Sequence, residues 1–221
     1  MGKNLVERLN EGPVLCAEGY LFAMERRGYL QAGAFVPEVV LENPEVLSQL
    51  HREFIRSGSD VVQAFTYYGH REKLRIIGKE HLLEPLQKNA LQIANNSKKE
   101  FKDLDLMVCG DIANTNVWDP NDKKTDLECQ KMFEEQVAWA KEAGVDFIVA
   151  ETITWLGEMK IALKAIKDAG LIAVCNFSIK FFPIFFQSLI LFLINLNKNF
   201  IFHNLFLQPH YPPILMENPL P

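Results

Sequence analysis

The sequence predicts an α/β fold in which parallel strands alternate with helices. The main observation is a unit that occurs three times: an amphipathic helix, then a glycine, then a short apolar run. The apolar runs show no alternation of polar and apolar residues, which is typical of parallel strands buried on both faces. A glycine after a helix supplies the left-handed conformation that ends the helix. The three units comprise residues 51–66, 136–152 and 161–175.

Such alternation builds either an open doubly wound sheet or a closed (β/α)₈ barrel. The first apolar run, 14–17, leads into Glu18-Gly19-Tyr20 and not into the GxGxxG pattern of dinucleotide-binding sheets. We therefore expect residues 1–175 to form the amino-terminal part of a (β/α)₈ TIM barrel with about five strands. One domain, or part of one, is expected.

The order of the elements follows from local patterns. Gly12-Pro13 separates a short first helix from the first strand, and apolar residues at helical spacing mark the helix that begins near Pro44. Thr125-Asp126-Leu127-Glu128 fits a capping box at the start of the longest helix. The expected strands are 14–17, 59–66, 106–110, 147–150 and 171–175, and the expected helices are 5–10, 21–27, 44–56, 83–98, 125–143 and 161–169.

Composition narrows the function classes. Of 221 residues, 48% are hydrophobic and 23% charged, as in an ordinary soluble globular domain, and the net charge of -5 argues against a nucleic-acid partner. The four cysteines, Cys16, Cys109, Cys129 and Cys175, form no CxxC pair, so we interpret them as free thiols in a reducing compartment. The first residues contain no apolar targeting segment, and a cytoplasmic location is expected.

Residues 176–221 differ sharply in composition from the rest of the chain. They contain three charged side chains, nine of the 16 phenylalanines and six of the 11 prolines. We interpret this Phe-rich tail as sequence that does not continue the barrel natively, for example because of a truncated or mis-spliced gene model. The alternative is a membrane span at 181–196, although that run is slightly short of the roughly 20 residues required.

Polar side chains follow the predicted strands. In a parallel α/β barrel the active site lies at the carboxyl ends of the strands, so these side chains should meet at one mouth. A carboxylate there would suit a substrate amine or a metal-linked group, and an aromatic wall would suit an onium cation. The strand-end residues are Glu18, Thr66, Tyr68, Asp111, Asn114, Glu151, Thr152 and Asn176, with Phe35 as a further aromatic candidate.

Several motifs together resemble one family. They are residues 17–29 (AEGYLFAMERRGY), 37–38, 51–54 (HREF), 58–68 (GSDVVQAFTYY) and 146–152 (DFIVAET). In this order and spacing they are similar to the amino-terminal half of the homocysteine S-methyltransferases, with the greatest likeness to the betaine-homocysteine branch. The resemblance covers about residues 4–175. It implies a (β/α)₈ barrel that transfers a methyl group from betaine or a similar onium donor to homocysteine, giving methionine.

The resemblance also implies roles for individual residues. Glu18 and Gly19 correspond to the loop that surrounds the amino acid, and Glu151 to the carboxylate that binds its amine. Tyr68 and Phe35 correspond to the aromatic pocket of the donor, and Thr66, Asn114 and Thr152 complete the expected substrate-binding set. The chain departs from the betaine branch in three places: that branch has Asp-Gly-Gly at 17–19, Trp at 35 and Tyr at 152.

Zinc is the cofactor that the resemblance implies. In that family three cysteines from strands six and eight hold zinc, and Cys109 and Cys175 do not match them, so no residue of this chain is assigned to the metal. A thiol with a pKa of about 8.5 is mostly protonated at neutral pH without a metal, so we expect the isolated chain to be inactive or to need a complementing fragment.

Other interpretations remain open. One is a different barrel lyase that uses Glu151 as a base, although no strand-end lysine for a Schiff base is evident. Another is a non-catalytic or membrane-attached fragment. An open edge strand would also favour association of copies into a homo-oligomer.

Overall fold

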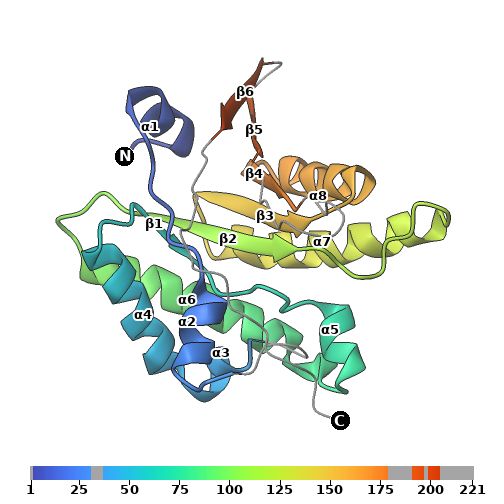
Figure 1. Ribbon diagram of the computed structural model, residues 1–221, viewed down its shortest axis with the longest axis horizontal. Coiled ribbons are helices and arrows are strands. Elements are labelled where there is room, and N and C mark those ends of the chain that lie inside the picture. The colour runs from blue at the N-terminus through green and yellow to red at the C-terminus, as the bar shows by residue number, and fades with distance from the viewer. Residues whose placement is uncertain (1, 31–36, 179–190, 197–198, 205–221) are drawn as a thin grey trace, which may run out of the picture.

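The computed structural model describes residues 2–30, 37–178, 191–196 and 199–204. Its centre is a four-stranded sheet with the strand order β1-β2-β3-β4, and all neighbouring pairs are parallel (Figure 1). The strands are β1 (Val61–Gln63), β2 (Met107–Ala113), β3 (Phe147–Ile153) and β4 (Ile172–Phe177). The α/β class and the partial (β/α)₈ barrel predicted from sequence are confirmed.

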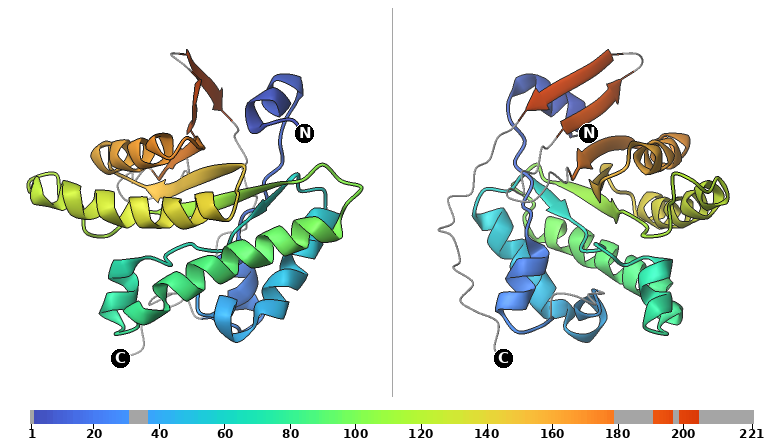
Figure 2. Two further views of the ribbon diagram at one scale, coloured as in Figure 1. Left: turned by 180° about the vertical axis from the view of Figure 1, so that it is seen from behind. Right: turned by 45° about the vertical axis from the view of Figure 1, so that its right-hand side comes forward.

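The helices occupy the connections between these strands. Figure 2 shows α6 and α7 in front of the sheet when the molecule is seen from behind. The helices are α1 (Leu5–Glu11), α2 (Tyr20–Arg26), α3 (Val39–Glu42), α4 (Pro44–Arg56), α5 (Arg71–Ile76), the 3₁₀ turn η1 (Glu80–Leu82), α6 (Leu83–Glu100), α7 (Lys124–Glu142) and α8 (Leu156–Asp168).

Strand alternation divides the core between the two faces of the sheet. On the outer face, Val62, Val108 and Ile148 pack with side chains of α6, α7 and α8, such as Leu91 and Phe133. The neighbouring residues of each strand point to the inner face, where their side chains pack with Leu5 of α1. These residues are Val61, Met107, Cys109, Phe147, Val149 and Val174. The inner face corresponds to the interior of a barrel.

The predicted first strand, 14–17, is reduced to a single parallel bridge between Cys16 and Val61. Two of its backbone N–H groups are taken by side chains of the opposing segment. Leu15 N donates to Asp60 Oδ2 at 2.8 Å, and Ala17 N donates to Ser59 Oγ at 3.1 Å. These bonds replace the ladder that a regular strand would form, so four of the five expected strands are present as strands.

The predicted helix 44–56 has these bounds in the structure, but the predicted capping box at Thr125 is wrong. The N-cap of α7 is Lys123, one position before the first helical residue. The Thr125 hydroxyl instead donates to the Asp122 carbonyl at 2.7 Å and accepts from Asp119 N at 3.0 Å. The Thr125 side chain therefore bonds to the loop before α7 and does not cap the helix.

The tail is only partly described. Strand β4 continues to Phe177, two residues past the predicted boundary at 175, and β5 (Leu191–Leu196) pairs antiparallel with β6 (Asn199–Asn204). Residues 181–190, most of the segment 181–196 considered as a membrane span, lie outside the described residues. In the part of the chain that is described, no helix is long and apolar enough to cross a membrane.

Replacing Phe133 with alanine should strongly destabilise the fold. The side chain is fully buried on α7 against the sheet, so Phe133→Ala should lower the free energy of unfolding by about 3–5 kcal/mol. Leu127→Ala on the same helix is the matched control, because Leu127 is 58% exposed and should cost less than about 0.5 kcal/mol. Equal shifts in urea unfolding for the two variants would contradict this packing.

Candidate functional site

Three polar side chains meet on the inner face of the sheet, above its apolar layer. Gln63 ends β1, Asp111 lies within β2 and Glu151 lies near the end of β3. In the parallel register Ala113 pairs with Glu151, and Asp111 is two residues before Ala113, so both carboxylates belong to the same face. Gln63 Nε2 donates a hydrogen bond to Glu151 Oε1 at 3.1 Å. Three adjacent strands therefore supply one polar cluster.

The two carboxyl groups of this cluster resist ionisation. Asp111 is 3% exposed, and burial raises its pKa well above the ordinary value, with a further contribution from the charge of Glu151. Burial also raises the pKa of Glu151 from 4.5 to about 7, and the charge of Glu18 adds to this. Two like charges so close together in a partly buried site favour a shared proton over two carboxylates.

Glu18 lies at the solvent-exposed rim of this cluster, and desolvation raises its pKa from the ordinary value. Gly19, which follows, has φ 88°, so a residue with a side chain would be strained there. An added Cβ would meet nothing within 4 Å, so the backbone conformation, and not close approach of a neighbour, explains the glycine.

The segment after Gly19 is held from behind by an aromatic cluster. Tyr20 begins α2, and its hydroxyl forms a 3.0 Å hydrogen bond with His51 Nδ1 of α4. The Tyr20 ring stacks on Phe65 and contacts Phe54 edge-on. Burial lowers the pKa of His51 to about 3, so its imidazole is neutral and has a structural role.

Two of the predicted site residues have unusual backbone conformations. Tyr68 has φ 57° and Thr152 has φ 55°, both in the left-handed region that residues with a Cβ rarely adopt. At Thr152 the pairing of β3 with β4 also shifts register between Ala150 and Ile153. Such strain costs about 1–3 kcal/mol per residue and is common at ligand-binding sites.

The Tyr68 ring already contacts a cation. Lys73 Nζ lies 4.3 Å from the ring centroid, and the Tyr67 ring centroid is 4.2 Å away. Two tyrosine rings therefore lie in contact here, and the ammonium group of Lys73 lies over one of them. Phe35, the other aromatic residue predicted for the aromatic wall, lies outside the described residues.

The remaining predicted residues make bonds within the chain. The buried Thr66 hydroxyl donates to the Asp111 carbonyl at 2.6 Å, which ties the end of β1 to β2. Asn114 Nδ2 donates to Asn116 Oδ1 at 2.7 Å in the loop after β2, so its amide is engaged there and not with the carboxylate cluster. Asn176 is half-buried in β4.

The cysteines do not fit a zinc site. Cys109 belongs to the apolar layer on the inner face, whereas Cys175 packs on the outer face, so the two thiols lie on opposite sides of the sheet. Burial raises the pKa of Cys109 and raises that of Cys175 to about 11, whereas zinc binds thiolates. Within the described ranges, no three His, Cys, Asp or Glu side chains are grouped as metal ligands.

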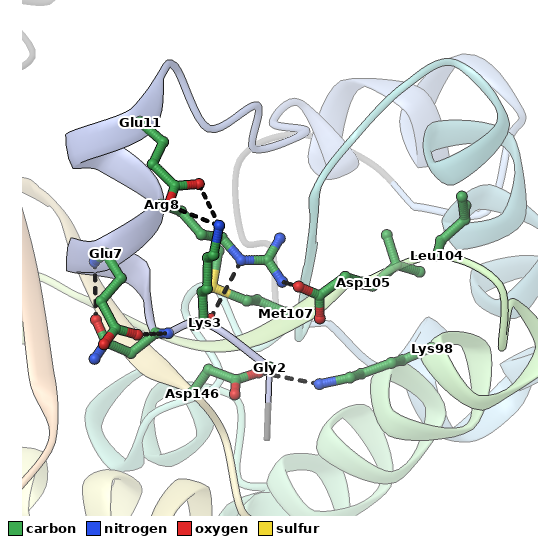
Figure 3. A pocket seen from close by; sticks show the side chains of 12 residues that line it. Gly2, Lys3, Glu7, Arg8, Glu11, Lys98, Leu104, Asp105, Met107 and Asp146 are labelled. Carbon is green, nitrogen blue, oxygen red and sulfur yellow. Dashed lines mark hydrogen bonds and ion pairs between the residues drawn. The ribbon is translucent and has the colours of Figure 1, made fainter.

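A cleft of about 960 Å³ lies at the other end of the sheet (Figure 3). It is bordered by α1, the end of α6 and the residues that enter β2 and β3. Its charges pair with one another: Lys3 with Glu11 at 2.6 Å, Arg8 with Asp105 at 2.8 Å, and Lys98 with Asp146 at 3.3 Å. In a barrel this end contributes to stability, so the strand-end cluster is the better candidate site.

Comparison with known proteins identifies the family. The sequence profile described as "Homocysteine S-methyltransferase" matches residues 15–183, more than half of the chain. The chain belongs to the homocysteine S-methyltransferase family. Over 171 residues it is 35% identical to betaine–homocysteine S-methyltransferase 1 of Bos taurus and to that of Sus scrofa, each match covering 76% of this chain. It spans 41% of the bovine and 60% of the porcine protein.

Solved structures show the same fold for the family. The metallated form of the homocysteine methyltransferase MmuM from Escherichia coli superposes with a TM-score of 0.64 and 18% identity, covering 77% of this chain and 64% of that one. The apo form gives a TM-score of 0.58. At this identity the likeness concerns the fold alone. The family resemblance drawn from the motifs at 17–29, 58–68 and 146–152 is confirmed by the match of the family profile and by the 35% identical relatives.

The sequence analysis did not identify Gln63, and it did not predict that Asp111 is buried within a strand. Gln63 stands in an otherwise apolar run, and a polar residue inside a buried strand is the signal that would have identified it. Asp111 was expected just beyond its strand, but β2 continues to Ala113 and encloses it. The boundary of the strand decides whether this carboxylate is a rim group or a buried one.

Glu151→Gln should remove a pH dependence of stability. Because the folded pKa of Glu151 is raised from 4.5 to about 7, the folded state binds this proton more tightly than the unfolded state. The free energy of unfolding should therefore fall by about 3 kcal/mol as pH rises from 4.5 to 7, and this fall should shrink in the variant. Urea unfolding at several pH values measures it, with the exposed Glu128→Gln as control. An unchanged slope in Glu151→Gln would refute the assignment.

Proposed function

We propose that this chain provides the amino-acid-binding part of a homocysteine S-methyltransferase. The observation that carries the proposal is the cluster of Gln63, Asp111 and Glu151, which three parallel strands bring together at the mouth of a barrel whose family binds an amino acid. A protonated amine is the natural partner of such carboxylates. This chain spans only part of the length of its relatives, so the methyltransferase activity of a whole enzyme is also a proposal.

The proposed roles follow from position. Glu151 binds the ammonium group of homocysteine, oriented by its bond from Gln63. Glu18 and Gly19 form the rim that closes over the amino acid. In the proposed arrangement Thr66 acts indirectly, by holding the backbone of β2 beside Asp111, and Asn114 shapes the loop beyond it.

Betaine is the proposed methyl donor. The support is the 35% identity to proteins named as betaine–homocysteine S-methyltransferases and the aromatic face of Tyr68, which already holds an ammonium group of Lys73. An onium donor has the same attraction to an aromatic face. Phe35 and Thr152 are the proposed neighbours of the donor, and methionine is the proposed product.

When bound in such an enzyme, zinc would activate the homocysteine thiol. The residues described here do not fit a zinc site, so no step is assigned to a metal on this chain.

The proposed domain organisation keeps residues 1–175 as the barrel part and 176–221 as a separate tail. Four free thiols support a reducing, cytoplasmic location, and association of copies into a homo-oligomer remains a prediction.

Glu151→Gln should weaken the binding of L-homocysteine about ten- to a hundredfold. The physical reason is the loss of a charge-assisted hydrogen bond worth about 1.5–3 kcal/mol. Isothermal titration of the full chain measures the dissociation constant, and Glu128→Gln, an exposed glutamate on α7, is the matched control. Failure of the unmodified chain to bind homocysteine, or equal affinity in both variants, would overturn the proposal.

The purified full chain should retain much less than one zinc ion and should form no methionine from homocysteine and betaine. The reason is that Cys109 and Cys175 lie on opposite faces of the sheet and are buried as thiols. Elemental analysis after gel filtration and a methionine assay measure the two quantities, with the bovine relative assayed in parallel. One tightly bound zinc per chain together with turnover would contradict the assignment.

A further inference from the structure

Asp111 has a buried carboxyl group that lies near Glu151 and Gln63 but makes no hydrogen bond of ordinary geometry with either of them. It is 3% exposed, and neither of its carboxylate oxygens accepts a hydrogen bond of ordinary geometry from the described residues. A buried acceptor without a donor costs free energy, and a buried carboxylate costs more than a neutral group. The fold thus keeps a costly carboxyl group directly above the apolar residues Cys109 and Val149 of the same face.

The position of Asp111 in β2 places its side chain next to Glu151 and Gln63 of the candidate site. It pairs with Val149 in the register of β2 and β3, two residues deeper in the sheet than the Ala113–Glu151 pair. Glu151 and Gln63 both lie close enough to influence its pKa. The two carboxylates and the Gln63 amide therefore come from three adjacent strands and border one small region.

We infer that Asp111 is a second carboxylate for the ammonium group of the bound amino acid, acting together with Glu151. The inference rests on the proposed function and adds a residue that determines specificity for a primary amine. A primary ammonium carries several N–H donors in a compact cation, which suits several acceptors in one small region. A quaternary or sulfonium donor has no N–H group to offer the two Asp111 oxygens.

The groups around the pair make it selective for a cation. The titratable side chains that act on Asp111 and Glu151 from neighbouring segments are Glu18, Cys16, Cys109, Tyr20 and Tyr67, and none of these carries a positive charge. In the absence of ligand the pair keeps a proton near neutral pH. When an ammonium group binds, both carboxylates are stabilised as anions and the shared proton leaves to the solvent.

Calorimetric titration of the full chain with L-methionine tests this inference. L-methionine has the same ammonium and carboxylate groups and carries no thiol, so the ligand adds no thiol titration. The companion probe is 4-(methylthio)butanoate, the same molecule without the amine. Titrations in two buffers of different ionisation enthalpy give the number of protons released. The variants are Asp111→Asn and, as matched control, Asp103→Asn, which replaces an exposed aspartate in the loop before β2.

The expected result is that Asp111→Asn weakens L-methionine binding at least about tenfold at pH 8, with no comparable effect on 4-(methylthio)butanoate. The unmodified chain should release a proton near pH 7 with L-methionine and none with the companion probe, and Asp111→Asn should reduce the release to the part that Glu151 alone contributes. Equal affinity of Asp111→Asn and Asp103→Asn for L-methionine would overturn the inference.

The design separates this inference from the proposed function. If the unmodified chain binds neither L-homocysteine nor L-methionine, the proposed function fails and the inference fails with it. If it binds both and Asp111→Asn changes nothing, only the inference fails. If the Asp111→Asn variant does not fold, the proton release of the unmodified chain is the deciding measurement. No proton release on binding of L-methionine would overturn the inference.

Discussion

The parallel register of β1 to β4 is the constraint on which the rest of this structure depends. In a parallel sheet all strands end at the same edge, and side chains at matching positions point to the same face. One set of side chains therefore packs under α6, α7 and α8, and the other faces the barrel interior. A shift of one residue in any strand would exchange the two sets. The register thus decides which polar groups meet.

The inner face is divided into two layers of different chemistry. Its lower layer is apolar and packs with Leu5 of α1, and its upper layer holds Gln63, Asp111 and Glu151. The lower layer stabilises the sheet by excluding water, and it also deprives the upper carboxylates of solvent. Desolvation is the largest cause of the raised pKa values of Asp111 and Glu151. The same burial that stabilises the fold therefore also raises the pKa of both carboxyl groups.

Conformational strain accompanies this chemistry at the strand ends. Tyr68 and Thr152 have positive φ, and Gly19 supplies a third left-handed position on the Glu18 loop. All three lie at or after the carboxyl end of a strand or its equivalent segment, where function is expected in a barrel. Strain of this kind persists only when surrounding packing imposes it. The Tyr20–His51 hydrogen bond and the Phe65 stack provide such packing behind the Glu18 loop.

The sequence by itself determined the alternation of the longer helices with the strands β1 to β4, the parallel α/β class and the family, because helix-Gly-strand units and contiguous motifs are local properties of the chain. It also placed Glu151 at a strand end. The short helices α3 and α5 were not predicted. Only the tertiary structure decided that β2 extends past Asp111, that Asp60 and Ser59 reduce the first strand to a bridge, and that Cys109 and Cys175 face opposite sides. These features depend on register and burial between segments far apart in the chain, which no local pattern encodes.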